Sequence, residues 1–385
     1  MDTKYNWKEK REKRAFLALA DGTVYRGHSV GALKDCLGEV VFNTGMTGYQ
    51  EILSDPSYNG QIVTMTYTEM GNYGVTMQDM ESRACFANGF IVHQLNEPSS
   101  WRGEMSLRDF LIRNSIPALA GIDTRALTSK LRDTGTLRGY ISVEQKAGEQ
   151  EAIQKAKEWI GLDGQDYASR VSCTAPYEWD ADGKLTAAWG ISAELPTADL
   201  KIVAYDFGIK WNILRRMRLA GMNVTVVPAQ TPADKVLAMK PDGVFYSNGP
   251  ADPAGVTYAI DTMKSMIGKV PVMGICLGHQ IMGIALGGKT YRLKFGHHGC
   301  NQPVKDLKTG KVEITSQNHN FAVDIDSLDR SRIEVTHINL NDQTTEGIEH
   351  KHEPMFSIQY HPEAAPGPHD SSYLFGRFRE LIAKA

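Results

Sequence analysis

The sequence predicts an α/β protein with two domains, a mixed α/β domain in residues 1–160 and a mostly parallel sheet with helices on both faces in residues 199–385. A chain of 385 residues is longer than one ordinary hydrophobic core requires. From Leu200 onward, short apolar runs alternate with helical segments, which is typical of a parallel sheet. Between the domains, residues 161–198 lose this periodicity and are rich in small and acidic residues, so we expect a linker there.

The first domain contains short strand-like runs separated by turn signals. Residues 16–20 and 23–25 flank an Asp-Gly pair, which predicts a hairpin. Further strands are expected in residues 39–43, 62–67 and 90–93, and helices in residues 107–114, 124–132 and 148–160.

The second domain has a more regular pattern. Strands are expected in residues 201–206, 223–227, 243–246 and 270–275, and helices in residues 209–220, 232–239, 254–267 and 279–286. Several strands follow Lys289, and a last helix is expected in residues 371–383. Functional groups on such sheets gather at the carboxyl ends of the strands.

Composition narrows the class of protein. Hydrophobic residues make up 42% of the chain and charged residues 23%, as in soluble globular proteins. A net charge of −3 gives no electrostatic reason to expect nucleic acid or an anionic membrane as a partner. The charged first 14 residues do not resemble a secretory signal. The five cysteines include no C-x-x-C pair, so a cytoplasmic protein without a zinc knuckle is expected.

A cysteine at a predicted strand end is the first candidate for chemistry. Residues 274–278 read G-I-C-L-G, the form of a nucleophile elbow, in which small residues let a strand turn sharply into a helix. Free N–H groups at the start of the helix favour the Cys276 thiolate and stabilise a developing oxyanion. The alternative is a buried structural cysteine, which is where most free cysteines belong.

A base for this nucleophile is found near the end of the chain. His361 follows an apolar run, and Glu363 lies two residues further on, which places it on the same side of an extended segment. On its own the His-x-Glu pair is a weak signal. Together with the elbow it predicts a triad, with Cys276 as nucleophile, His361 as general base and acid, and Glu363 as the orienting carboxylate.

Residues 274–280 (GICLGHQ) and 361–363 (HPE) together resemble the class I (triad) glutamine amidotransferase family. This resemblance covers residues 200–383 and implies a flavodoxin-like sheet. It also implies that Cys276 attacks the side-chain amide of glutamine, that His361 transfers the proton, and that ammonia leaves from a thioester intermediate.

Other segments resemble the small-chain family of carbamoyl-phosphate synthetases. They are residues 39–51 (EVVFNTGMTGYQE), 55–58 (DPSY), 121–125 (GIDTR), 204–208 (AYDFG) and 366–370 (PGPHD). This resemblance implies a glutaminase subunit that passes ammonia through a tunnel to a large chain. The large chain would use ATP, Mg²⁺ and bicarbonate to make carbamoyl phosphate for pyrimidine and arginine synthesis, so no cofactor is expected on this chain.

The resemblance also implies which residues bind glutamine. The matching positions are Ser57, Gly249, Ala251, Leu277, Gln280, Asn318, Asn320 and Phe321. Ser57 would reach the site from the first domain. The family usually has glycine where this chain has Ala251 and Asn320. Asparagine tolerates a left-handed backbone better than alanine does, so residues 248–252 are where glutamine affinity could differ from that of the family.

Two further patterns are interpreted as structural. Residues 283–290 (GIALGGKT) match a phosphate-binding loop in form, but the glycines end a predicted helix and a strand (residues 290–294) follows, so a helix C-cap is expected. The histidines at 297, 298, 350 and 352 have no acidic or cysteine partner at ligand spacing, so no metal site is expected.

Three other functions remain open from the sequence alone. The chain could be the amidotransferase module of an anthranilate, GMP or CTP synthetase, although the first-domain segments argue against this. It could be a regulatory subunit that has lost its chemistry, or a cysteine peptidase built on a similar elbow.

Overall fold

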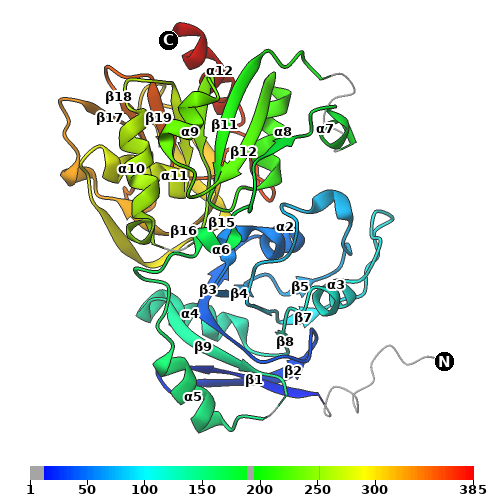
Figure 1. Cartoon of the computed structure of the whole chain (residues 1–385). Coiled ribbons are helices and arrows are strands. Elements are labelled where there is room, and N and C mark those ends of the chain that lie inside the picture. Colours follow the sequence, from blue (N-terminus) through cyan, green and yellow to red (C-terminus); the bar gives the residue numbers. More distant parts are fainter. Residues whose placement is uncertain (1–12, 145, 189–194, 251) are drawn as a thin grey trace. The chain divides into compact units, whose positions relative to one another are not determined.

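The structure, a computed structural model, describes residues 13–144, 146–188, 195–250 and 252–385 (Figure 1). The chain divides into two compact units, Met1–Leu162 and Asp163–Ala385. Each unit is described by itself.

The described part of the first unit is built around a closed barrel with the strand order β1-β2-β8-β6-β4-β3-β9. The barrel strands are β1 (Arg14–Leu19), β2 (Val24–Ser29), β3 (Cys36–Asn43), β4 (Gln61–Met65), β6 (Gly89–Ile91), β8 (Ala118–Ala120) and β9 (Leu137–Ser142). A separate small sheet pairs β5 (Glu69–Met70) with β7 (Gln94–Leu95). The predicted hairpin is confirmed, because β1 and β2 pair antiparallel.

Two of the helices in this unit start at a polar residue whose side chain caps them. The helices are α2 (Tyr49–Ser54), α3 (Leu107–Arg113), α4 (Thr124–Thr134) and α5 (Glu149–Glu158), with 3₁₀ turns η1 (Pro56–Tyr58) and η2 (Met77–Asp79). The Ser106 side chain accepts a hydrogen bond from the Asp109 N–H at the start of α3, and Asp123 accepts one from the Ala126 N–H at the start of α4. The predicted helices of this unit are therefore confirmed within a few residues.

The second unit contains a ten-stranded sheet with the order β10-β12-β11-β13-β14-β19-β18-β16-β15-β17 among the described residues. The strands are β10 (Tyr177–Trp179), β11 (Leu200–Asp206), β12 (Met222–Pro228), β13 (Gly243–Tyr246), β14 (Val272–Ile275), β15 (Thr290–Asp306), β16 (Val312–Val323), β17 (Ile333–Asn339), β18 (Thr345–His350) and β19 (Met355–Ile358). The run from β12 to β19 is parallel, as predicted, and antiparallel strands extend it on both sides.

Helices cover both faces of the parallel part of this sheet, which confirms the predicted fold class (Figure 1). The helices are α6 (Ala168–Val171), α7 (Lys184–Ala188), α8 (Trp211–Leu219), α9 (Ala233–Ala238), α10 (Thr257–Met266), α11 (Leu277–Ala285) and α12 (Leu374–Lys384), with 3₁₀ turns η3 (Pro253–Gly255) and η4 (Ile325–Ser327). Alternate strand residues face opposite ways. Tyr205 and Tyr246 therefore pack with α9, α10 and α11, whereas Ala204 and Phe245 pack with α8 and α12.

The segment expected to be a linker, residues 161–198, contains short elements in its described part. The elements α6, β10 and α7 all lie within it, and β10 pairs antiparallel with β12 at the edge of the sheet. Nearly all of these residues belong to the second unit, which begins at Asp163.

The glycine-rich segment after α11 is a helix end. Gly287 has a φ of 96°, and the Gly288 N–H donates to the Gly283 carbonyl at 2.9 Å, which is the hydrogen bond of a Schellman cap. Strand β15 begins at Thr290. The interpretation of this segment as a helix C-cap is confirmed, because a phosphate-binding loop precedes its helix.

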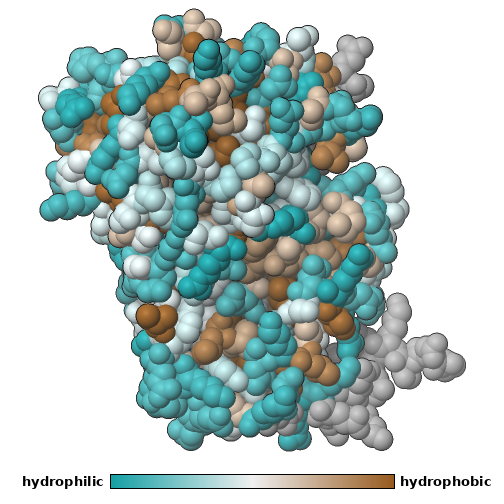
Figure 2. All heavy atoms as spheres, viewed as in Figure 1, coloured by the Kyte–Doolittle hydropathy of each residue, from teal (hydrophilic) through white to brown (hydrophobic). Residues whose placement is uncertain are grey.

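Most of the visible surface is hydrophilic, with hydrophobic residues exposed in places (Figure 2). In the first unit the exposed large hydrophobic residues include Leu33, Met46 and Trp101, and Trp101 is 92% exposed. None of the helices in the described residues has the length and apolar character that crossing a membrane requires.

Candidate active site

The predicted nucleophile lies in a strained turn between β14 and α11. Cys276 has φ 53° and ψ −104°, a conformation that residues other than glycine rarely adopt. The small neighbours predicted for an elbow are required here by close backbone contacts. A Cβ on Gly278 would lie 2.1 Å from the Tyr246 carbonyl oxygen, and one on Gly274 would lie 2.7 Å from the Gly278 oxygen.

Hydrogen bonds hold the turn on both sides. The Cys276 N–H donates to the Ile358 carbonyl of β19 at 2.9 Å, and its Sγ lies 3.6 Å from the Asn318 carbonyl oxygen of β16. At the start of α11, the N–H groups of Gly278 and His279 already donate, to the carbonyls of Ser247 and Cys276 respectively. The Leu277 N–H is therefore the first-turn donor that best suits an oxyanion next to the sulfur.

The other two predicted triad residues are brought together as expected. Strand β19 pairs in parallel with β14, so both strands end at the same edge of the sheet. Beyond β19, the Nδ1 of His361 lies 2.6 Å from Glu363 Oε1. The His361 N–H also donates to the Ser316 carbonyl of β16 at 2.9 Å. Both side chains are buried.

A lysine that the sequence analysis did not select completes this group. Lys210 Nζ donates to Glu363 Oε1 at 3.0 Å and to the Ala364 carbonyl at 2.6 Å, and it is only 2% exposed. It follows β11, another parallel strand, and so reaches the same edge of the sheet. In the sequence, Lys210 could have been noticed as a lysine that closely follows a predicted buried strand. Its partner, Glu363, lies 153 residues further along the chain.

The charges of this group shift each other's protonation. Burial opposes the charged form of His361, but the Glu363 carboxylate and the Cys276 sulfur outweigh it and raise the pKa of His361 to about 10. Burial likewise opposes the Glu363 charge, but Lys210 and His361 lower the pKa of Glu363 to about 2. At neutral pH the group is therefore Lys⁺, Glu⁻ and His⁺ beside the sulfur.

Six of the eight predicted glutamine-binding residues lie in the described part of the second unit, and the carbonyl oxygen of one of them, Asn318, lies 3.6 Å from the sulfur. They are Gly249, Leu277, Gln280, Asn318, Asn320 and Phe321. Gln280 Nε2 donates to the Phe321 carbonyl at 2.9 Å, which fixes β16 against α11. A Cβ on Gly249 would lie 2.3 Å from the Phe207 carbonyl oxygen, so glycine is needed at that position.

The remaining predicted residues have different outcomes. Ala251 lies outside the described residues. Ser57 lies in η1 of the first unit, where its N–H donates to Asp55 Oδ1 at 2.8 Å, and its contribution to the site of the second unit stays a prediction. Asn320 lies in strand β16 without a positive φ, so its tolerance of a left-handed backbone is not used.

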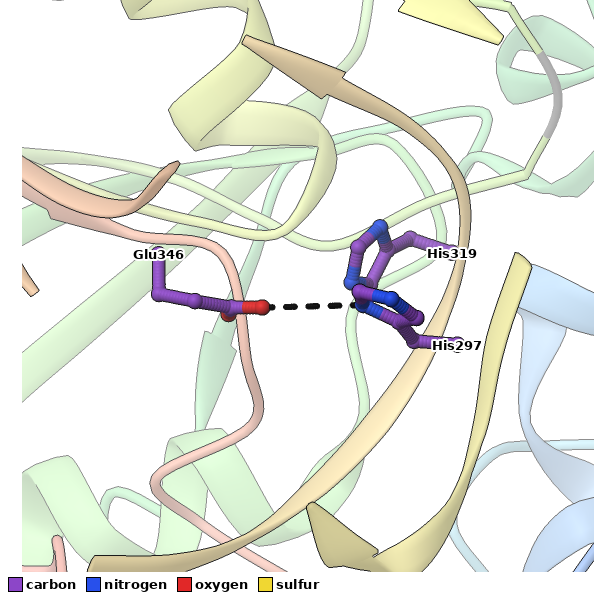
Figure 3. Close-up of side chains that lie close together, drawn as sticks. All are labelled: His297, His319 and Glu346. Atoms are coloured by element: carbon purple, nitrogen blue, oxygen red, sulfur yellow. Dashed lines mark ion pairs between the residues drawn. The ribbon is translucent and has the colours of Figure 1, made fainter. Parts of the chain in front are cut away.

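A second group of titratable side chains lies in the same sheet. His297, His319 and Glu346 place three potential metal-ligand atoms within 4.8 Å of one another (Figure 3). Their hydrogen bonds favour an ion-pair network over a metal site. Burial opposes a charge on His297, but Asp342 and Glu346 raise its pKa to about 9, so the ring is protonated at neutral pH and has no free lone pair. Both ring nitrogens of His319 already face carbonyl oxygens.

Comparison with known proteins gives the family. The family described as "Glutamine amidotransferase class-I" matches residues 203–381, and "Carbamoyl-phosphate synthase small chain, CPSase domain" matches residues 17–141. A "Carbamoyl phosphate synthase small chain" from Syntrophotalea carbinolica is 52% identical over 96% of this chain and 98% of its own length. The chain belongs to the carbamoyl phosphate synthase small-chain family.

Further small chains of the family are similar over nearly the same span. The one from Solidesulfovibrio magneticus is 50% identical and covers 96% of this chain and 99% of its own length. The chloroplastic one from Oryza sativa subsp. japonica is 50% identical over 96% of this chain and 82% of its own. A putative GMP synthase subunit from Thermoplasma acidophilum, 21% identical over 48% of this chain and 92% of its own, has a TM-score of 0.40, which is too low to add to the assignment.

Replacing Gly278 by alanine should destabilise the protein by about 2 kcal/mol or more, because the new methyl group would overlap the Tyr246 backbone. Chemical denaturation of the full chain measures this. Gly376→Ala in α12 is the matched control, since no atom lies within 4 Å of its Cβ position, and it should stabilise by about 0.5–1 kcal/mol. Equal stability of Gly278→Ala and wild type would contradict the close packing of the elbow.

Replacing Lys210 by methionine should cost about 3 kcal/mol of unfolding free energy, because it leaves a buried carboxylate with one cation in place of two. The control is Lys264→Met, which breaks an exposed pair with Asp261 and should cost at most about 0.5 kcal/mol. Similar losses of unfolding free energy in both variants would contradict a larger stabilisation by the buried Lys210–Glu363 pair.

Proposed function

We propose that this small chain hydrolyses glutamine at Cys276 and supplies the ammonia to the large chain of carbamoyl phosphate synthase. The observation that carries the proposal is the common edge of β14 and β19, where Cys276 lies beside the buried His361–Glu363 pair. Membership of the small-chain family and the class I amidotransferase match support it.

The proposed chemistry uses groups in the positions described above. The Cys276 thiolate attacks the carboxamide carbon of glutamine, and the developing oxyanion accepts a hydrogen bond from the Leu277 N–H. Protonated His361 gives its proton to the leaving nitrogen, which departs as ammonia and leaves a γ-glutamyl thioester. His361 then takes a proton from water, the hydroxide attacks the thioester, and glutamate leaves as the thiolate is restored.

In this proposal Glu363 and Lys210 act through His361. The carboxylate accepts the Nδ1–H bond, which keeps the proton-transferring Nε2 directed toward the sulfur. Lys210 keeps that carboxylate ionised despite its burial. By the family resemblance, glutamine is held by the six described residues of the second unit, together with Ala251 and Ser57.

The large chain is the proposed partner, and it would carry ATP, Mg²⁺ and bicarbonate. The exposed Leu33, Met46 and Trp101 of the first unit are side chains of the kind that a protein partner covers. Carbamoyl phosphate made by the complex would serve pyrimidine and arginine synthesis in the cytoplasm. The match of residues 17–141 to the small-chain domain disfavours an anthranilate, GMP or CTP synthetase module.

A regulatory subunit without chemistry is the second candidate, and the site disfavours it. In a chain that no longer used the triad, no catalytic gain would offset the free-energy cost of burying three charges and of straining the Cys276 backbone.

Cys276→Ser should lower glutamine-dependent carbamoyl phosphate synthesis by at least about 10³-fold, because a serine hydroxyl beside protonated His361 has no base to activate it. The complex should keep its activity with free ammonia, which serves as the control. Retention of glutamine-dependent activity by this variant would rule out Cys276 as the nucleophile.

The rate of glutamine hydrolysis should fall on the alkaline side near pH 10, where His361 loses the proton that it gives to the leaving nitrogen. Because the carboxylate raises the pKa of His361, Glu363→Gln should move this alkaline fall in the rate to lower pH. Glu151→Gln, at an exposed ion pair, should leave it in place. If the rate of Glu363→Gln still falls only near pH 10, the assigned role of Glu363 is contradicted.

A further inference from the structure

Strand β15 carries a histidine that contacts two of the predicted glutamine-binding residues. His298 pairs across the strands with Asn318. Its Nδ1 lies 3.0 Å from Asn318 Oδ1, and its Nε2 lies 2.9 Å from Asn320 Oδ1. All three side chains are buried. The imidazole therefore bridges two amides that lie two residues apart on one face of β16.

The number of protons on this ring constrains both amides. Burial lowers the pKa of His298 to about 4, so the ring is neutral at physiological pH. A neutral imidazole has one N–H group and one lone pair. Both ring nitrogens face an Oδ1 atom, and a ring with one N–H group can donate to only one of them. To form the second hydrogen bond, the other asparagine has to turn its amide nitrogen toward the ring. The orientation of one amide therefore determines the orientation of the other.

We propose that His298 is a positioning residue for glutamine, which couples the Asn320 side chain to Asn318 and so fixes the strand segment beside the nucleophile. The link to the reaction is short, because the Asn318 carbonyl oxygen lies 3.6 Å from Cys276 Sγ. This inference rests on the proposed glutaminase function and adds a residue that the predicted glutamine-binding set does not contain.

The surrounding backbone packs closely against the hydrogen bonds of His298. A Cβ on Gly296 would lie 2.4 Å from Asn320 Oδ1 and 2.5 Å from His298 Nε2, so the β15 backbone covers this hydrogen bond closely. Register shifts between Arg292 and His297 and between Gly299 and Gln302 flank the bridge, and the three residue pairs between them are regular. Such bulges re-aim side chains next to functional sites.

The opposite face of β16 is also held. His297 lies across from His319, with ring centroids 4.9 Å apart in an edge-on contact, and its Nε2 lies 2.8 Å from Asp342 Oδ2. Adjacent residues of β15 thus contact both faces of the strand that carries Asn318, a charged histidine on one side and a neutral one on the other. The bridge through His298 is the one that contacts the predicted glutamine-binding side chains.

Asn320 is the second hydrogen-bond partner of His298. The family usually has glycine at this position, which offers no side chain to the Nε2 of His298. In this chain the Asn320 amide fills that role, so His298 and Asn320 should act as a unit in glutamine binding.

The test uses the full chain and measures glutamine hydrolysis with purified variants. His298→Ala should raise KM for glutamine roughly tenfold, because Asn318 loses a buried hydrogen bond, and should change kcat less than about threefold. His352→Ala is the matched control, since His352 is exposed, and it should leave KM unchanged. An unchanged KM in His298→Ala, or a fall in kcat alone, would overturn the proposal.

A second pair of variants separates positioning from general loss of structure. Asn320→Gly should raise KM roughly threefold, and the double variant His298→Ala/Asn320→Gly should have the same KM as His298→Ala, since Asn320 acts through the ring. Additive effects on KM would contradict the coupling. If Cys276→Ser retains the wild-type rate of hydrolysis, the proposed function itself fails. If it does not and the KM values are unchanged, only the role of His298 fails.

Discussion

The parallel pairing of β14 with β19 is the constraint on which the site depends. Each strand is short and buried, and the last hydrogen bond between them joins the Cys276 N–H to the Ile358 carbonyl. Because parallel strands end at the same edge of a sheet, the pairing brings Cys276 and the segment that carries His361 together from distant parts of the chain. A shift of one residue in this register would turn every side chain of β19 to the other face.

The buried charges at this edge stabilise one another and would be costly alone. Lys210, Glu363 and His361 alternate in sign, so each ion that is removed from water faces an opposite charge within 3.0 Å. Apolar residues of similar volume would fold as well or better, because desolvating ions opposes folding. The arrangement is explained by what it does to protonation, since it keeps a proton on His361 beside the sulfur. The strained backbone of Cys276, at the turn between β14 and α11, is a second cost.

Local sequence patterns predicted much of this structure. The elbow (residues 274–278) and the His-x-Glu pair (residues 361–363) each span only a few residues, so the local geometry of each follows from strand and helix periodicity. Lys210 could not be predicted in the same way, because its contact with Glu363 depends on the order of strands in the sheet. The bridge from His298 to Asn318 and Asn320 was missed for a related reason. It depends on the register of β15 and β16 between two irregularities that no sequence pattern specifies.

The most direct measurement is mass spectrometry of the full chain quenched during turnover with glutamine. A γ-glutamyl adduct is expected on the peptide that contains Cys276, and it should be absent from Cys276→Ser. Turnover of glutamine without that adduct, or with the adduct on another cysteine such as Cys300, would show that the sulfur at the β14 turn is not the nucleophile.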